Sequence, residues 1–240
     1  MRILVTNDDG ITSIGLKLLV EKARKYGEVI VVAPLKEQSA KSQALNIKHG
    51  FSYQKIENFM EGIEAYAVDS TPADCVRFAN YYLRDEFELV LSGINNGYNL
   101  GEDILYSGTV GAASEGVMSG KMAIAISTKP HDFSEAEKQI EMVLDDIIYK
   151  LLPQSNFFNV NIPVPSQGIK ITKQGSTHFS TVFFKEGSDV FQRGKSNFHL
   201  DEETVDSDVY AIYQNYISIT PLSVDRTNHD IFNQLKKSYN

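Results

Sequence analysis

Short apolar runs alternate with amphipathic segments over residues 1–153. The runs at 2–5, 28–34 and 122–128 are rich in Val, Ile and Ala, which is typical of strands buried on both faces. Between the first two runs, Leu16, Leu19 and later apolar residues recur at helical spacing. Strand, helix and strand in close succession indicate a parallel βαβ unit, with helices covering both faces of the sheet.

The same alternation continues further along the chain. Thr71, Pro72 and Asp74 supply a cap, a first-turn proline and an acidic residue, which predicts a helix start. An apolar stripe from Ile140 to Leu151 predicts a packing helix. The remaining expected elements are strands at 65–68 and 87–93 and helices at 70–83 and 110–118.

The pattern of hydrophobic and polar residues changes after Pro153. Short β-rich pieces separated by Gly, Ser and Asp indicate strands and hairpins added to the core; they are 157–165, 168–174, 178–184, 208–214 and 216–222. The sequence therefore predicts an α/β protein with a doubly wound, mostly parallel sheet. Its core spans 1–153, and a β-rich extension of the same domain spans 154–240.

Composition narrows the class of protein. The chain has 240 residues, of which 42% are hydrophobic and 22% charged, as in ordinary globular proteins. A net charge of −8 argues against a scaffold for nucleic acid, which relies on basic surfaces. The lone Cys75 allows no internal disulfide, and neither a signal peptide nor a membrane-length apolar run is evident. We expect a cytoplasmic protein without membrane contact.

Polar residues follow several expected strands at the points where the strands end. An Asp-Asp-Gly sequence such as Asp8-Asp9-Gly10 is by itself usually a turn. In an open parallel sheet, however, the carboxyl ends of the strands meet at one edge, where ligands bind. The polar residues expected at that edge are Asp8, Asp9, Ser39, Ser42, Asn95, Asn96, Asn99 and Ser107–Thr109.

The chemistry of these residues is complementary. Carboxylate, hydroxyl and amide oxygens suit Mg²⁺ or Mn²⁺ better than zinc. Ser107–Thr109 lies at an expected helix start, where backbone N–H groups and the helix dipole attract phosphate. An acidic metal site beside a phosphate site predicts metal-assisted phosphoryl chemistry.

Several motifs in this order resemble the family of the stationary-phase survival protein SurE. They are "RILVTNDDGITSIGL", "VVAP" followed by Ser39, "TPADCV", "SGINNGYNLGEDILYSGTVGAASEG" and "YISITPLSVD", reaching to about residue 226. The resemblance implies a Rossmann-like core and a divalent-metal-dependent phosphatase that hydrolyses nucleoside 5′- or 3′-monophosphates, and sometimes polyphosphate. It also implies a homodimer or homotetramer that uses β-rich C-terminal elements in its contacts.

Carried over by position, the resemblance implies roles for particular residues. One Mg²⁺ or Mn²⁺ ion per subunit would be held by Asp8, Asp9, Ser39 and Asn95. Ser107, Gly108 and Thr109 would hold the phosphate, with Asn96 close by. Asp8 and Asp9 are the catalytic candidates, and Asp8 is either the nucleophile or the general base.

The chain departs from the family pattern in two places. The family usually has Arg-Ser-Gly around the metal-site serine, whereas this chain has Gln38 and Ala40 on either side of Ser39. The replaced arginine bears on how substrate charge is compensated, and the replaced glycine bears on the shape of the loop. The stretch 55–64 is also longer than the usual connection.

Three other functions compete with this interpretation. A signalling receiver domain also has an acidic pair after its first strand, and Lys129-Pro130 fits its pattern. A receiver needs a phosphoacceptor aspartate at the end of its third strand, where this chain has Ser92 and Asn95. Adjacent aspartates do not fit a haloacid-dehalogenase phosphatase. A catalytically silent nucleotide-binding module is the third alternative.

Overall fold

The expected parallel sheet is present, with the first strand near its centre. The computed structural model describes residues 1–198 and 205–239. The strands are β1 (Arg2–Thr6), β2 (Glu28–Pro34), β3 (Tyr53–Lys55), β4 (Glu64–Val68), β5 (Leu89–Asn96), β6 (Met122–Thr128), β7 (Phe157–Ile162), β8 (Ile169–Ile171), β9 (Thr177–Glu186), β10 (Asp189–Phe198) and β11 (Ile217–Pro221). The α-helices are α1 (Ile14–Ala23), α2 (Pro72–Arg77), α3 (Gly108–Met118), α4 (Ser134–Asp146), α5 (Asp208–Tyr213) and α6 (His229–Tyr239). Shorter helical turns are η1 (Phe78–Tyr82), η2 (Gly101–Leu105) and η3 (Ile147–Leu151).

Strand order creates a switch point beside β1. Among the described residues the main sheet has the order β3-β4-β2-β1-β5-β6-β7-β11-β8. The strands from β4 to β7 run parallel, with Val5 paired to Val31 on one side and to Leu91 on the other. The chain thus passes from β1 to β2 on one side and later returns to β5 on the other. Loops that follow β1 and β5 therefore face each other across the position where such folds bind ligands.

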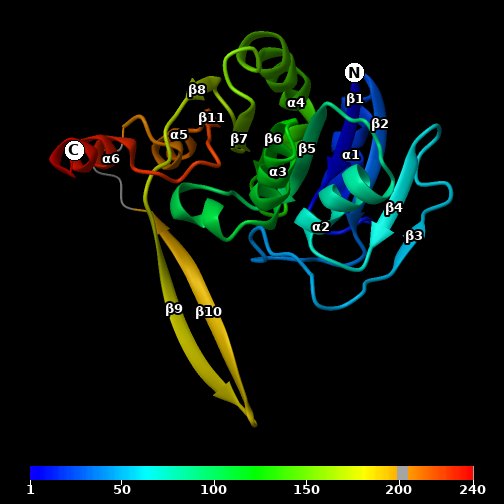
Figure 1. The fold of residues 1–240 in the computed structure, drawn as a ribbon, viewed down its shortest axis with the longest axis horizontal. Coiled ribbons are helices and arrows are strands. Elements are labelled where there is room, and N and C mark those ends of the chain that lie inside the picture. Colours follow the sequence, from blue (N-terminus) through cyan, green and yellow to red (C-terminus); the bar gives the residue numbers. More distant parts are fainter. Residues whose placement is uncertain (199–204, 240) are drawn as a thin grey trace.

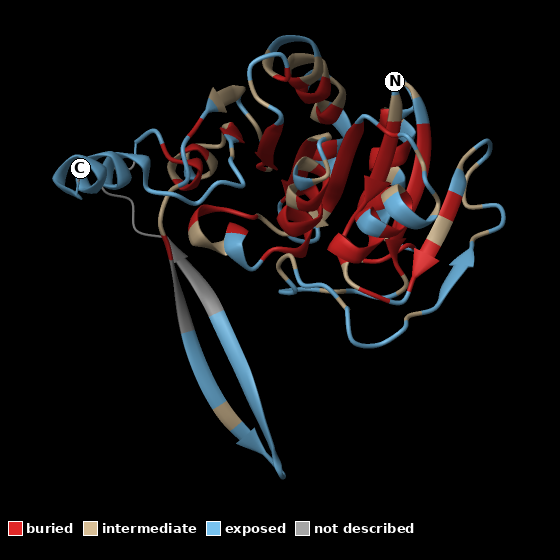
Figure 2. Ribbon diagram, viewed as in Figure 1, coloured by how far each residue is buried: buried red, intermediate tan, exposed pale blue. Residues whose placement is uncertain are grey.

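Helices cover both faces of the sheet (Figure 1). On one face, Leu16 and Leu19 of α1 and Ile140 of α4 belong to one buried cluster with apolar side chains of the sheet. On the other face, Val76 of α2 and Val110 of α3 belong to a second buried cluster. Figure 2 shows that the central strands are buried almost throughout. The predicted doubly wound α/β fold is confirmed.

Side-chain caps begin the helices at the carboxyl edge. The hydroxyl of Ser13 accepts a hydrogen bond from the Leu16 backbone N–H at 3.2 Å. Thr71 accepts one from the Asp74 N–H in the same way, as the sequence predicts. Each cap satisfies a backbone N–H that has no partner within the helix, and so fixes where the helix starts.

The region after Pro153 differs in part from the expected strands and hairpins. Residues 208–214 were expected to be β-rich, yet 208–213 form α5. Ser207 caps that helix by accepting from the Tyr210 N–H at 3.1 Å, and Asp208 lies in its first turn. A short apolar run is compatible with either a strand or a helix. Here the Ser207 cap favours the helix. The C-terminal helix α6 was also not expected.

The C-terminal strands have two arrangements. β7, β11 and β8 continue the main sheet, with β11 antiparallel to β7. β9 and β10 instead pair with each other and project away from the rest of the chain (Figure 1). This hairpin exposes Val182, Phe183 and Val190. Within the described residues, no helix has the length and apolar character that crossing a membrane requires.

Candidate active site

The loop after β1 is built as a tight turn around Asn7. The Asn7 amide donates hydrogen bonds to the Gly10 carbonyl at 3.0 Å and to the Ser13 hydroxyl at 2.7 Å. Gly10 has a φ of 94°, a conformation that glycine adopts without strain. The turn therefore joins β1 directly to the capped start of α1 and places Asp8 and Asp9 at the edge of the sheet.

Asp8 touches the start of α3. The Thr109 hydroxyl donates a hydrogen bond of 2.5 Å to Oδ1 of Asp8, and both side chains are buried. A Cβ added to Gly108 would lie 2.9 Å from Cβ and from Oδ2 of Asp8. Ser107 caps the helix by accepting from the Val110 N–H at 3.1 Å. The acidic pair and the expected phosphate site are thus in direct contact.

Burial makes the charge on this acidic pair unfavourable. The pKa of Asp8 is raised to about 6, chiefly by burial and also by the charge of Asp9, while the Thr109 hydrogen bond opposes the rise. The pKa of Asp9 is raised by burial and by the charge of Glu37, against a lowering effect of the Asn96 N–H. A bound cation would relieve this penalty.

The Ser39 loop lies against the acidic turn. The Gln38 N–H donates to the Asp8 carbonyl at 2.7 Å. The Ser42 N–H donates to the Tyr106 carbonyl at 2.9 Å, and the Ser42 hydroxyl donates to the Leu105 carbonyl at 2.7 Å. The Ser39 side chain is exposed, and its hydroxyl donates to Glu37 at 2.6 Å. The loop is therefore placed at the site, while the Ser39 hydroxyl is bonded to Glu37.

Ala40 stands where the family usually has glycine, and its backbone explains that preference. Its φ is 57°, in the left-handed region. Glycine adopts this region without penalty, whereas an L side chain is strained by roughly 1–2 kcal/mol. The loop keeps the left-handed conformation despite the added Cβ.

The loop after β5 contacts the acidic pair through its backbone. The Asn96 N–H donates to Oδ2 of Asp9 at 3.1 Å, and the Asn96 side-chain oxygen accepts from the His131 N–H at 2.7 Å. The Asn95 amide donates to the Gly97 carbonyl at 2.8 Å, which leaves its oxygen outside that bond. Asn95 and Asn96 thus lie at the same edge as Asp9.

Asn99 was grouped with these residues but has a different role. Its side chain is buried and donates to the Ser127 hydroxyl at 2.8 Å. Its backbone N–H donates to Asn161, and its carbonyl accepts from Asn159 and Asn161 at 2.9 Å. This network ties the loop that leads to α3 onto β6 and β7.

The donor set fits a hard divalent cation. Two carboxylates meet at the edge, with a hydroxyl and an amide on the neighbouring loops, and oxygen donors of this kind suit Mg²⁺ or Mn²⁺. In residues 1–198 and 205–239, no three His, Cys, Asp or Glu side chains cluster as a metal site. Neutral oxygens and water would therefore complete the coordination.

Three contributors were not expected from the sequence. Glu37 bonds Ser39, Asn7 shapes the acidic turn, and His131 orients Asn96. Asn7 lies within the recognised motif and could have been found there. No sequence pattern marks Glu37 or His131 as part of the site, because their contacts depend on the conformation of the loops.

Comparison with known proteins identifies the family of this chain. A profile of the family described as "Survival protein SurE" matches residues 3–181. A 5′-nucleotidase SurE from Clostridium beijerinckii is 38% identical over 256 residues, covering 100% of this chain and 99% of its own length. One from Pseudoalteromonas atlantica is also 38% identical, covering 99% and 98%.

A solved structure gives the same result for the fold. The SurE protein from Aquifex aeolicus has a TM-score of 0.81 and 33% sequence identity, and the match covers 100% of both chains. The receiver interpretation finds no support, since β5 ends in Ser92–Asn96 without an aspartate. The chain belongs to the SurE family.

Proposed function

We propose that the protein is a divalent-metal-dependent 5′-nucleotidase, which hydrolyses nucleoside monophosphates to nucleoside and phosphate. The observation that carries the proposal is the contact between Asp8 and the start of α3, through the 2.5 Å bond from Thr109. This contact places the acidic pair, whose carboxylate oxygens suit a divalent metal ion, beside a helix start that can bind phosphate. The curated relatives that match over the whole chain are named 5′-nucleotidases.

The loops at the ends of β1, β2 and β5 support the metal-site assignment. We assign the metal ligands to Asp8, Asp9, Ser39 and Asn95, with one ion per subunit. For Ser39 this requires its hydroxyl to exchange the contact with Glu37 for one with the ion. When bound, the ion would polarise the phosphate and lower the pKa of water.

The phosphate contacts fall to the start of α3. We assign Ser107, Gly108 and Thr109 to phosphate binding, with Asn96 beside them. Gly108 is the key position, because the absence of a side chain keeps the space next to Asp8 open. The backbone N–H groups of the first turn stabilise the negative charge that develops on the phosphoryl oxygens.

Asp8 takes part in the attack on phosphorus by one of two routes. In the first, a water oxygen forms a bond to phosphorus, its proton passes through Asp8 to the ribose oxygen, and the bond from phosphorus to that oxygen breaks. In the second, the Asp8 carboxylate forms the bond to phosphorus, the ribose oxygen leaves with a proton from water, and a second water then hydrolyses the acyl phosphate to regenerate Asp8 and release phosphate. Acid quenching during turnover of ³²P-labelled nucleotide separates the two routes, since only a nucleophilic Asp8 leaves label on the protein.

Assembly and location are further parts of the proposal. We infer a homodimer or homotetramer, supported by the exposed apolar residues Val182, Phe183 and Val190 on the projecting hairpin. A cytoplasmic location stays a prediction from the sequence. Sedimentation of the purified protein tests the first, and cell fractionation tests the second.

A phosphate-release screen tests the function. Purified protein is incubated with 5′- and 3′-nucleoside monophosphates and with Mg²⁺, Mn²⁺ or EDTA. We expect release that requires metal and is lost in EDTA. Nucleotide binding without release under every condition would contradict the enzyme and favour a silent binding module.

A further inference from the structure

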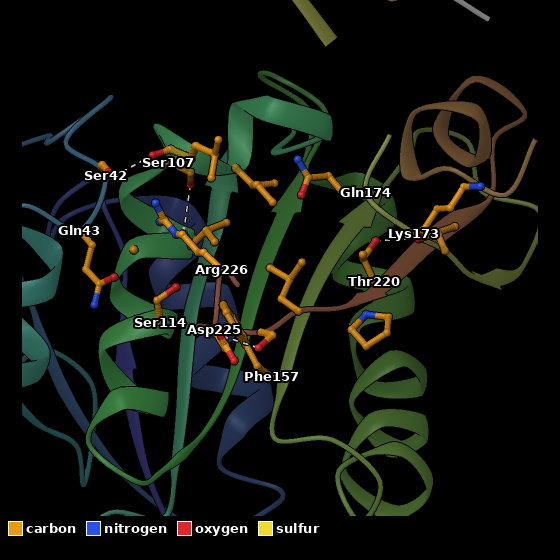
Figure 3. A pocket seen from close by; sticks show the side chains of 18 residues that line it. Ser42, Gln43, Ser107, Ser114, Phe157, Lys173, Gln174, Thr220, Asp225 and Arg226 are labelled. Carbon is orange, nitrogen blue, oxygen red and sulfur yellow. Dashed lines mark hydrogen bonds between the residues drawn. The ribbon is translucent and has the colours of Figure 1, made fainter. Parts of the chain in front are cut away.

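A cavity of about 450 Å³ lies beside α3 (Figure 3). Ser107, Val110, Gly111 and Ser114 line it from one side of the helix, whereas Gly108 and Thr109 face Asp8. These four positions follow helical spacing, so one face of α3 forms the wall. Ser107 thus belongs both to the helix start at the acidic pair and to the rim of the cavity.

Arg226 enters this cavity from the segment after β11. Figure 3 shows its side chain extending along α3 toward Ser107 and Ser42. Among the described residues no carboxylate forms an ion pair with it. The neighbouring Asp225 instead bonds His229 at 2.9 Å and accepts from the Thr227 N–H at 2.9 Å. The Arg226 guanidinium is therefore available to a ligand.

The site otherwise has a strongly negative character. Asp8, Asp9 and Glu37 lie on the other loops, Gln38 is uncharged, and the chain has a net charge of −8. A cationic side chain near the start of α3 would offset the charge of a phosphate dianion bound there, in addition to the metal ion. A guanidinium is well suited, because its planar fork pairs with two phosphate oxygens at once.

We propose that Arg226 binds the substrate phosphate from the cavity side of α3, opposite the metal edge. The inference rests on the proposed function, since it assigns a further contact in the same phosphate site. Arg226 is a binding residue in this account, so its removal weakens phosphate binding more than it slows the chemical step.

The test compares Arg226→Gln and Arg226→Lys with Lys173→Gln as a matched control. Lys173 lines the same cavity, and Figure 3 shows it on the side away from Ser107. For Arg226→Gln we expect KM for AMP and the inhibition constant for inorganic phosphate to rise about tenfold, with a smaller change in kcat. Arg226→Lys should restore part of the loss, and Lys173→Gln should match the wild type.

Two results would overturn the inference. One is an unchanged inhibition constant for phosphate in Arg226→Gln, and the other is an equal rise in Lys173→Gln. Calorimetric titration of inorganic phosphate into the Mn²⁺-loaded wild type and Arg226→Gln gives a readout that does not need turnover. If the wild type hydrolyses no nucleotide, the proposed function fails, while the titration still decides whether Arg226 binds phosphate.

Discussion

The Thr109 hydroxyl donates a 2.5 Å hydrogen bond to Oδ1 of Asp8, across 101 positions of sequence. Both groups are buried, so the bond acts where water does not compete. It holds the Asp8 carboxylate in one orientation against α3. The geometry of the acidic pair therefore depends on a residue at the start of α3, where we propose that phosphate binds.

Replacing Thr109 with valine tests this dependence. Loss of the donor leaves a buried carboxylate oxygen without a partner, so we expect the free energy of unfolding to fall by about 1–3 kcal/mol. We also expect kcat/KM for a nucleoside monophosphate to fall by about tenfold or more. Urea denaturation and steady-state kinetics measure the two effects. Thr109→Ser keeps the hydroxyl and should remain near wild type; equal losses in both variants would contradict the role of the bond.

Gly108 is expected to tolerate no side chain. A Cβ there would lie 2.9 Å from Asp8 and 3.2 Å from Pro72, so Gly108→Ala must displace Asp8 or the helix start. A shift near 1 Å at a reacting group lowers kcat/KM by about 100-fold. Gly50→Ala is the control, because an added Cβ at Gly50 meets nothing within 4 Å. Full activity in Gly108→Ala would show that the contact does not limit the site.

The raised pKa of Asp8 predicts a pH dependence of stability in protein stripped of metal by EDTA. The pKa rises from 3.8 to about 6 on folding, so the folded protein binds more protons than the unfolded chain between these values. Stability therefore falls as pH rises from about 4 to about 6, by about 3 kcal/mol in total, and is constant above that range as far as Asp8 is concerned.

Asp8→Asn isolates this effect, because the amide oxygen still accepts from Thr109. The gain in unfolding free energy over wild type should be near zero at pH 4 and reach about 3 kcal/mol at pH 7.5. Urea denaturation at several pH values measures it. A difference between the two proteins that does not vary with pH would exclude Asp8 as the cause.

Asn99 is expected to act on stability and, through the loop, on activity. Asn99→Ala removes the bond to Ser127 and leaves that buried hydroxyl without its partner. We expect a loss of about 1–3 kcal/mol in unfolding free energy. Because Asn99 lies in the loop that leads to Ser107, kcat/KM should fall as well. Unchanged stability in urea would contradict the structural role of this network.

The sequence predicts the core better than the periphery for a physical reason. Strands such as β1 and β2 are buried on both faces, so their apolar runs are nearly continuous and easily recognised. The segment that forms α5 is short, and its cap at Ser207 decides between helix and strand. Short segments lack the periodicity that long ones carry.

The same distinction applies to the site. The sequence predicts that Asp8 and Thr109 lie at the same edge of the sheet, because the carboxyl ends of parallel strands meet there. The bond between Ser39 and Glu37 and the left-handed conformation of Ala40 depend on how one loop folds. Asn99 carries a side-chain amide of the kind that binds metal ions. In the structure, however, this side chain is buried and stabilises the loop.

The most direct test of the account is the rate of phosphate release from a nucleoside 5′-monophosphate by Asp9→Asn, measured beside wild type across Mg²⁺ or Mn²⁺ concentrations. Asp9→Asn nearly preserves shape and removes one of the two charges expected to hold the ion. Even residues that only orient metal ligands are worth about 10–100-fold, so we predict a fall of at least about 100-fold. Metal-dependent turnover equal to that of the wild type would contradict the metal site at Asp8 and Asp9.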